Sequence, residues 1–155
     1  MSGQIAGHDL LTTSTTALLA VGTWHVDPLG RFWQYAKGAA TIAVSEYVKV
    51  SGDGLFTLTS LTTTTNPSTE PASVGNTGVA FTSTLFGWVF RGNGLHTGKF
   101  AASCVQDVKI YTTATAGVVD DAATTLVSGL KLITTITTAA ASPAFATGLL
   151  QTSHA

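Results

Sequence analysis

The segment Leu85-Phe86-Gly87-Trp88-Val89-Phe90 decides the expected fold class. Its aromatic and β-branched side chains fit the pleated, half-buried surface of a β-strand. The run Gly92-Asn93-Gly94, which follows it, is typical of a turn. Together with Val79-Ala80-Phe81, the segment predicts two aromatic-rich strands that cross the core, the second of which ends at this turn.

Short strand-like segments continue on both sides of this stretch. They comprise 22–26 and 31–36 around the turn Asp27-Pro28-Leu29-Gly30, 40–50 and 55–61 around the turn Ser51-Gly52-Asp53-Gly54, and then 105–113, 114–119 and 130–138. We expect breaks of register near 47–50, where the alternation is poor. Turn signals about every ten residues favour a sandwich or a barrel. The sequence therefore predicts an all-β protein with a single compact β-sandwich or β-barrel domain over residues 17–138.

Three regions lie outside this strand pattern. Residues 1–16 show no alternation and predict an extended N-terminal arm. Residues 62–78 predict a long loop rich in Thr and Pro, since Pro67 and Pro71 each lack a backbone donor. Residues 139–155 are apolar and carry no charged side chain, so they predict a C-terminal tail or an edge strand that docks on another subunit. The one helix that we expect is a short turn at 120–127.

The charge pattern excludes two classes of partner. The 155 residues include 7 Lys and Arg and 8 Asp and Glu, which gives a net charge of −1. Without a basic cluster we expect no nucleic-acid binding, which depends on cations that contact phosphates. The apolar runs fall short of the ~20 residues that a membrane helix needs, so we expect no membrane partner. A lone cysteine, Cys104, excludes an intrachain disulfide, and residues 1–19 lack the cationic start of a secretory signal.

One stretch has the outline of a phosphate-binding loop. Gly98-Lys99 resembles the end of such a loop. However, Asn93 stands where a glycine is required, and Phe100 stands where the hydroxyl residue that contacts Mg²⁺ is required. The stretch therefore favours a glycine-rich turn over a nucleotide site.

The titratable side chains form no pattern typical of catalysis. The candidates are His8 with Asp9, His25 with Asp27, His96 with Cys104, the pair Asp120-Asp121, and the dispersed acids Asp53, Glu70 and Asp107. None has the spacing of a zinc site, a calcium loop or the paired acids of a glycosidase. We therefore predict no catalytic, metal-binding or cofactor-binding residue and expect a protein that is not an enzyme.

The aromatic side chains carry more information than the charges. Trp24, Trp33 and Trp88 lie in expected strands, where an ordinary β core accounts for them. An exposed tryptophan among them would offer a stacking platform for a sugar. A carbohydrate-binding function therefore stays open.

Three segments, read together, have a recognisable pattern. They are Phe86-Gly87-Trp88-Val89-Phe90-Arg91-Gly92, then Ala101-Ala102-Ser103-Cys104, then Ile110-Tyr111-Thr112-Thr113-Ala114-Thr115-Ala116-Gly117-Val118-Val119-Asp120-Asp121. Upstream, Gly22-Thr23, Asp27-Pro28-Leu29-Gly30-Arg31 and Tyr35-Ala36-Lys37-Gly38-Ala39 extend it, so that it covers about residues 20 to 138. The pattern resembles the head decoration, or capsid cement, proteins of tailed bacteriophages.

The resemblance implies a virion structural protein, made in the host cytoplasm and placed on the outer surface of the capsid. Such a protein binds the major capsid protein and stabilises the contacts between its subunits. The resemblance also implies self-association, for which we favour a trimer, and no cofactor. The quoted residues would maintain the fold, and the arm, the loops and the tail would make the contacts. The alternatives are a carbohydrate-binding protein and a tail or head-tail joint protein of the virion.

Overall fold

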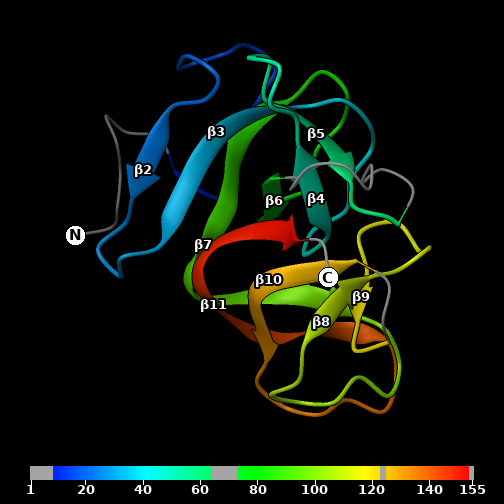
Figure 1. Cartoon of the computed structure of the whole chain (residues 1–155). Coiled ribbons are helices and arrows are strands. Elements are labelled where there is room, and N and C mark those ends of the chain that lie inside the picture. The colour runs from blue at the N-terminus through cyan, green and yellow to red at the C-terminus, as the bar shows by residue number, and fades with distance from the viewer. Residues whose placement is uncertain (1–8, 64–72, 123–124, 154–155) are drawn as a thin grey trace.

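The computed structural model describes residues 9–63, 73–122 and 125–153, and these form strands and no helix (Figure 1). The strands are β1 (Thr13–Ser14), β2 (Trp24–Val26), β3 (Phe32–Gly38), β4 (Tyr47–Val50), β5 (Thr57–Ser60), β6 (Ser73–Asn76), β7 (Phe86–Phe100), β8 (Ile110–Thr112), β9 (Val119–Asp120), β10 (Leu126–Leu132) and β11 (Ala140–Ser153). The all-β prediction is confirmed. Within these residues, no helix is present that is long and apolar enough to cross a membrane.

The strands form one mixed sheet that closes on itself twice, and strand β7 belongs to both closures. In the first ring, β7 pairs with β3, which pairs with β5, then β4, then β6, and β6 returns to β7. In the second ring, β7 pairs with β9, then β8, β10 and β11, and β11 returns to β7. Figure 1 shows β7 passing from the upper group of strands into the lower group. Strands β1 and β2 flank the first ring by pairing with β7 and β3.

Strand β7 serves two rings because it bends at the predicted turn. Its backbone has positive φ at Gly92 (142°), Asn93 (62°) and Gly94 (137°). A Cβ atom at Gly92 would lie 1.8 Å from the carbonyl oxygen of Gly148 on β11, so a larger residue has no room there. The expected turn at 92–94 is therefore wrong, because the same positive φ values support a bulge in a strand that continues to Phe100.

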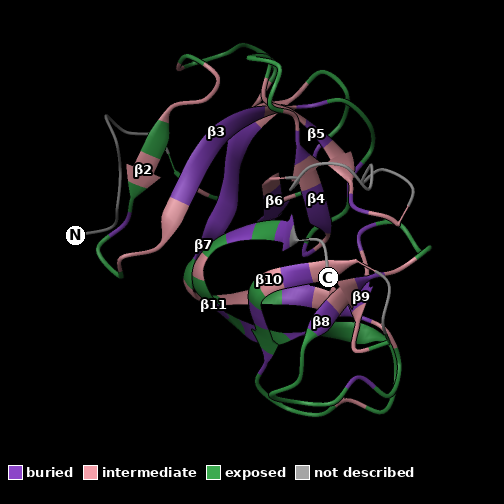
Figure 2. Cartoon of the chain, in the orientation of Figure 1, coloured by how far each residue is buried: buried purple, intermediate pink, exposed green. Residues whose placement is uncertain are grey.

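Alternating side chains of β7 supply two apolar clusters. Val89 packs with Ala36 of β3, Val48 of β4 and Leu58 of β5, all strands of the first ring. Its neighbours Trp88 and Phe90 point the other way and join a larger cluster. That cluster extends into the second ring through Phe100, Ile110, Val119, Val127, Leu130, Leu132, Ala144, Ala146 and Leu150. Figure 2 shows that the first half of β7 is mostly buried.

Both predicted hairpins form as expected. Strands β2 and β3 are joined by a turn in which the N–H of Gly30 donates to the carbonyl of Asp27 at 2.8 Å. Strands β4 and β5 pair in antiparallel fashion around residues 51–56. The break of register expected near 47–50 is not there, since 47–50 pair with β5 and β6 without a shift. The interruption lies earlier, at 43–46, between an isolated bridge at Ile42 and strand β4. The partner of Ile42 is Phe81, so 79–81 forms this bridge and not the first of the two core strands that we expected.

Other sequence predictions are corrected. Residues 73–76 of the expected 62–78 loop form β6, whose short Ser-Val-Gly-Asn sequence has no apolar alternation; the residues 64–72 lie outside the described chain. The strand expected at 130–138 is β10, shifted toward the N-terminus, and it occupies part of the expected 120–127 helical turn. Most of the expected tail or edge strand, 139–155, is β11, which pairs with β10 on one side and β7 on the other. In the expected 1–16 arm, Thr13 and Ser14 pair with β7, while 1–8 lie outside the described chain.

Candidate functional site

Strands β7 and β11 present an exposed apolar face on the outside of the second ring. Leu95 of β7 lies directly opposite Phe145 of β11, and the two side chains are 57% and 41% exposed. Residues opposite each other in an antiparallel pair share one face of the sheet. Leu149, opposite Gly92, is 48% exposed further along β11. We call Leu95, Phe145 and Leu149 the β7–β11 apolar face, in which a break of register separates Leu149 from the other two. Exposed apolar groups that gather on one surface mark interaction sites.

Two cations beside this face are already paired. Arg31 Nε lies 2.7 Å from Asp27 Oδ2, and its Nη1 donates to the carbonyl of Leu95 at 3.4 Å. Lys99 Nζ lies 3.1 Å from Glu46 Oε1. By contrast, Lys131 of β10 lies opposite Phe145 and is exposed. The apolar face therefore has a cationic border on its β10 side.

Asp27, a sequence candidate with His25, is structural. Its carboxylate accepts hydrogen bonds from the backbone N–H groups of Leu29 and Arg31, from Arg31 Nε and from Trp33 Nε1. Burial raises the pKa of Asp27, but these hydrogen bonds and the Arg31 charge outweigh it and hold the pKa below its usual range. His25 instead packs against Trp88, with ring centroids 5.9 Å apart. The two residues therefore do not form an acid–base pair.

The structure pairs His96 with Tyr47. His96 Nε2 and Tyr47 Oη are 2.9 Å apart, and the imidazole stacks on Phe90 at a centroid distance of 4.5 Å. Burial lowers the pKa of His96 to about 4, so the ring is neutral at pH 7. Together with Trp33 and other side chains, His96 lines a hollow of about 240 Å³.

Gly98 and Lys99, which resemble the end of a phosphate-binding loop, both contact other residues of the fold. A Cβ atom at Gly98 would lie 2.1 Å from Tyr47 Oη, which explains the glycine without a phosphate. Lys99 is engaged by Glu46. Both residues lie in a paired part of β7 and not in a loop.

The structure brings Cys104 to Asp120 and Asp121, a contact that sequence reasoning missed. Their potential ligand atoms all lie within 4.8 Å of one another, a mixed set of one soft sulfur and two hard carboxylate oxygens. The carboxylates also have local roles, since Asp121 Oδ2 accepts from the Val105 N–H at 2.9 Å. Burial, with the two carboxylates adding to it, raises the pKa of the Cys104 thiol to about 11. Burial also raises the pKa of Asp120.

Those of the remaining acidic candidates that the structure describes are not brought together. Asp53 closes the β4–β5 turn by accepting from Ser51 Oγ and the Leu55 N–H. Asp107 lies beside β8, Asp9 accepts from the Leu11 N–H, and Glu70 and His8 lie outside the described residues.

Of the three tryptophans, all of them described, Trp33 and Trp88 are buried and Trp24 is 47% exposed. Its ring covers the guanidinium of Arg91 at 5.2 Å. Arg91 is itself buried, donates to the Val74 carbonyl at 2.9 Å and also bonds Gln34 Oε1. Burial lowers the pKa of Arg91 to about 10. Trp24 is therefore the one tryptophan of the three on which a sugar could stack.

Comparison of the chain with protein-family models, with curated proteins and with solved structures finds no match.

Proposed function

We propose that this protein is a virion structural protein that binds the outside of an assembled phage capsid and stabilises the contacts between subunits of the major capsid protein. The β7–β11 apolar face carries the proposal. Its three apolar side chains are displayed on strands that pair with each other, and β11 also pairs with β10, so they are held in place before binding. Preorganised apolar groups give an interface most of its free energy, because little conformational freedom is lost on contact.

The segments that carry the sequence resemblance contribute mainly to the core, which leaves binding to other parts of the protein. Trp88 and Phe90 in the first, Cys104 in the second, and Ile110 and Val119 in the third are buried in one cluster. They therefore maintain the fold, as the resemblance implies. The apolar face lies instead on β11 and the second half of β7, where the expected tail has become a strand.

The proposed mechanism is interfacial burial. A protein that spans two capsid subunits adds its own binding free energy to the work needed to separate them, and many copies act on one shell. Self-association, for which a trimer is favoured, would cover further edges. We also propose that the two rings make the domain a pair of small barrels that share β7, since each circuit of pairings closes on itself.

The test is cosedimentation of the purified protein with capsid shells that lack it, before and after expansion. We expect saturable binding at a copy number that matches the local symmetry axes of the shell. The variant Leu95→Asp should weaken this binding by roughly tenfold or more, as for a residue at the centre of an interface.

The matched control is Leu55→Asp. Leu55 is 62% exposed but lies in the β4–β5 turn, away from the apolar face. Equal loss in both variants, or no loss in Leu95→Asp, would remove the apolar face from the interface. A few copies per particle would favour the tail or head-tail joint alternative. Glycan binding without shell binding, abolished by Trp24→Ala, would favour the carbohydrate-binding alternative.

A further inference from the structure

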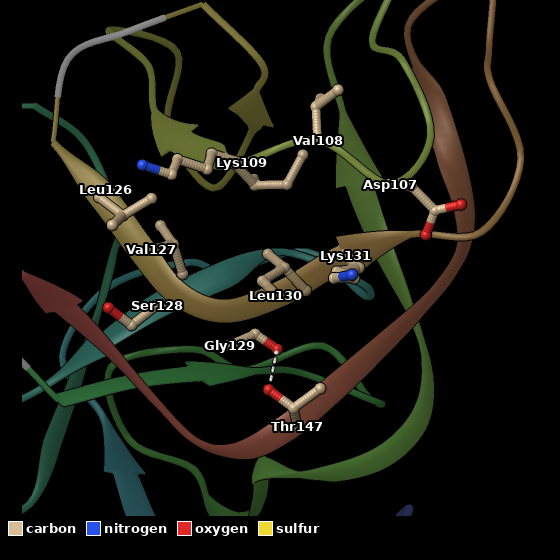
Figure 3. A pocket seen from close by; sticks show the side chains of 11 residues that line it. Asp107, Val108, Lys109, Leu126, Val127, Ser128, Gly129, Leu130, Lys131 and Thr147 are labelled. Atoms are coloured by element: carbon tan, nitrogen blue, oxygen red, sulfur yellow. Dashed lines mark hydrogen bonds between the residues drawn. The ribbon is translucent and has the colours of Figure 1, made fainter.

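The wall of the second ring opens at one end of β8, where a groove lies between residues 107–110 and β10 (Figure 3). Strands β8 and β10 pair at Ile110 and Val127. The two segments meet again where the N–H of Asp107 donates to the carbonyl of Leu132 at 3.2 Å. Residues 128–131 thus face the shorter stretch 108–109, and the segments separate around a hollow of about 460 Å³. We call this hollow the β8–β10 groove.

The pairing of β10 with β11 is interrupted beside the groove. Gly129 has a φ of 80°, and the pairing of β10 with β11 shifts register between Ser128 and Leu130. Thr147 Oγ1 donates to the Gly129 carbonyl at 3.3 Å, as the dashed line in Figure 3 shows. Residues 147–150 of β11 stand against the single residue Gly129 of β10, so the extra residues lie in β11, and such an irregularity disrupts the ladder locally. The groove is therefore built into the fold.

The lining of the groove combines cations with an apolar floor. Lys109 reaches it from one side and Lys131 from β10 (Figure 3). The ion pairs found in the described part of the chain are Arg31 with Asp27 and Lys99 with Glu46, and neither lysine takes part. One carboxylate, that of Asp107, also lines the groove, which leaves an excess of one positive charge. The buried side chains of Ile110, Val127 and Leu130 form the floor.

We propose that the β8–β10 groove receives an acidic side chain, glutamate or aspartate, from an extended segment of the major capsid protein. This inference rests on the proposed function and names the polar half of the same interface. The aliphatic stem of the acidic residue would lie on the apolar floor. Its carboxylate would pair with Lys109 or with Lys131, whose amines lie at opposite ends of the groove (Figure 3). The groove is continuous with the β7–β11 apolar face, because Lys131 lines the groove and lies opposite Phe145. Ion pairs across an interface fix the register and orientation of the two partners.

The test is zero-length crosslinking of decorated shells with a carbodiimide, which joins a lysine amine to a carboxylate in contact with it. We expect crosslinked peptides that contain Lys109 or Lys131 and an acidic residue of the major capsid protein. The internal control is Lys49 of β4, which lies outside the groove. Crosslinks at Lys49 in place of Lys109 and Lys131, or no crosslinks in decorated shells, would overturn the proposal.

A second arm uses the double variant Lys109→Glu with Lys131→Glu, beside Lys49→Glu. We expect the double variant to bind shells roughly tenfold or more weakly and to lose the salt dependence of the wild type, since the salt-sensitive pairs are gone. Unchanged melting temperatures would show that both variants fold. If the wild type binds shells and the double variant binds equally well, the proposal for the β8–β10 groove is overturned and the proposed function is not. If the wild type does not bind shells, the proposed function is overturned as well.

Discussion

Trp33 Nε1 donates a hydrogen bond of 3.1 Å to Oδ2 of Asp27. A core tryptophan of β3 is therefore anchored by the turn that joins β2 to β3. The same carboxylate oxygen accepts from Arg31 Nε at 2.7 Å, and Arg31 lies 5.5 Å from the Trp33 ring. Asp27 therefore connects the geometry of the β2–β3 turn to the packing of the larger apolar cluster. Loss of the Asp27 charge should therefore affect the turn and the packing of Trp33.

Asp27→Asn should lower the free energy of unfolding at pH 7 by about 1–3 kcal/mol, because it removes the ion pair and leaves buried donors poorly matched. The folded pKa of Asp27 lies below its unfolded value of 3.8. Its contribution is therefore present above pH 4 and is lost as the pH falls through the folded pKa. Urea unfolding of both proteins should show a gap at pH 7 that narrows toward pH 2. A constant gap would mean that the charge of Asp27 does not matter.

His96 should give a second, separate dependence of stability on pH. Its folded pKa of about 4 lies below the ordinary value of 6.5, so the unfolded chain binds a proton first as the pH falls. The free energy of unfolding should therefore decrease between pH 6.5 and pH 4, by about 2–3 kcal/mol in total. His96→Gln can still bond Tyr47 and should lack this decrease. Parallel pH profiles of the two proteins would contradict the assignment to His96.

Local sequence signals predicted the parts of the fold in which neighbours along the chain pair. The turn Asp27-Pro28-Leu29-Gly30 specifies a hairpin because Asp27 closes it with its own side chain. The run Gly92-Asn93-Gly94 carries similar signals but lies within a strand, since its partners Phe32 and Leu149 are distant in sequence. A positive φ is common to turns and bulges, and only the long-range pairing distinguishes them.

The candidate surfaces depend even more on long-range register. Leu95 and Phe145 share a face because β7 and β11 align there, and a slip of one residue would bury one of them. Cys104 lies beside Asp120 and Asp121 because β7 pairs with β9, and no local sequence pattern predicts that pairing. Strand β6 was missed because its glycine, Gly75, fits against Val89 where an apolar side chain would have marked a core strand.

Trp88 and Trp24 should respond in opposite ways to truncation. Trp88 is buried and packs edge-on against Tyr35 at 5.3 Å, so Trp88→Ala should lower the free energy of unfolding by about 3–5 kcal/mol. Trp24→Ala should change it by about 1 kcal/mol or less, since the exposed indole loses mainly its contact with Arg91. Chemical unfolding measures both values. Similar losses in the two variants would be inconsistent with the burial of Trp88.

Gly98→Ala tests whether this glycine serves the core. A methyl group there would lie 2.1 Å from Tyr47 Oη, and Tyr47 is fully buried, so the ring cannot move without disturbing its contacts with His96 and Phe100. Overpacking of this kind costs about 1–3 kcal/mol. The matched control is Gly52→Ala, at a turn glycine with no atom within 4 Å of the added methyl group. Calorimetry should show a lower melting temperature for Gly98→Ala and little change for Gly52→Ala. If Gly98→Ala melts as the wild type does, the glycine is not required by Tyr47, and the explanation of the Gly98-Lys99 pair as part of a packed strand loses its main support.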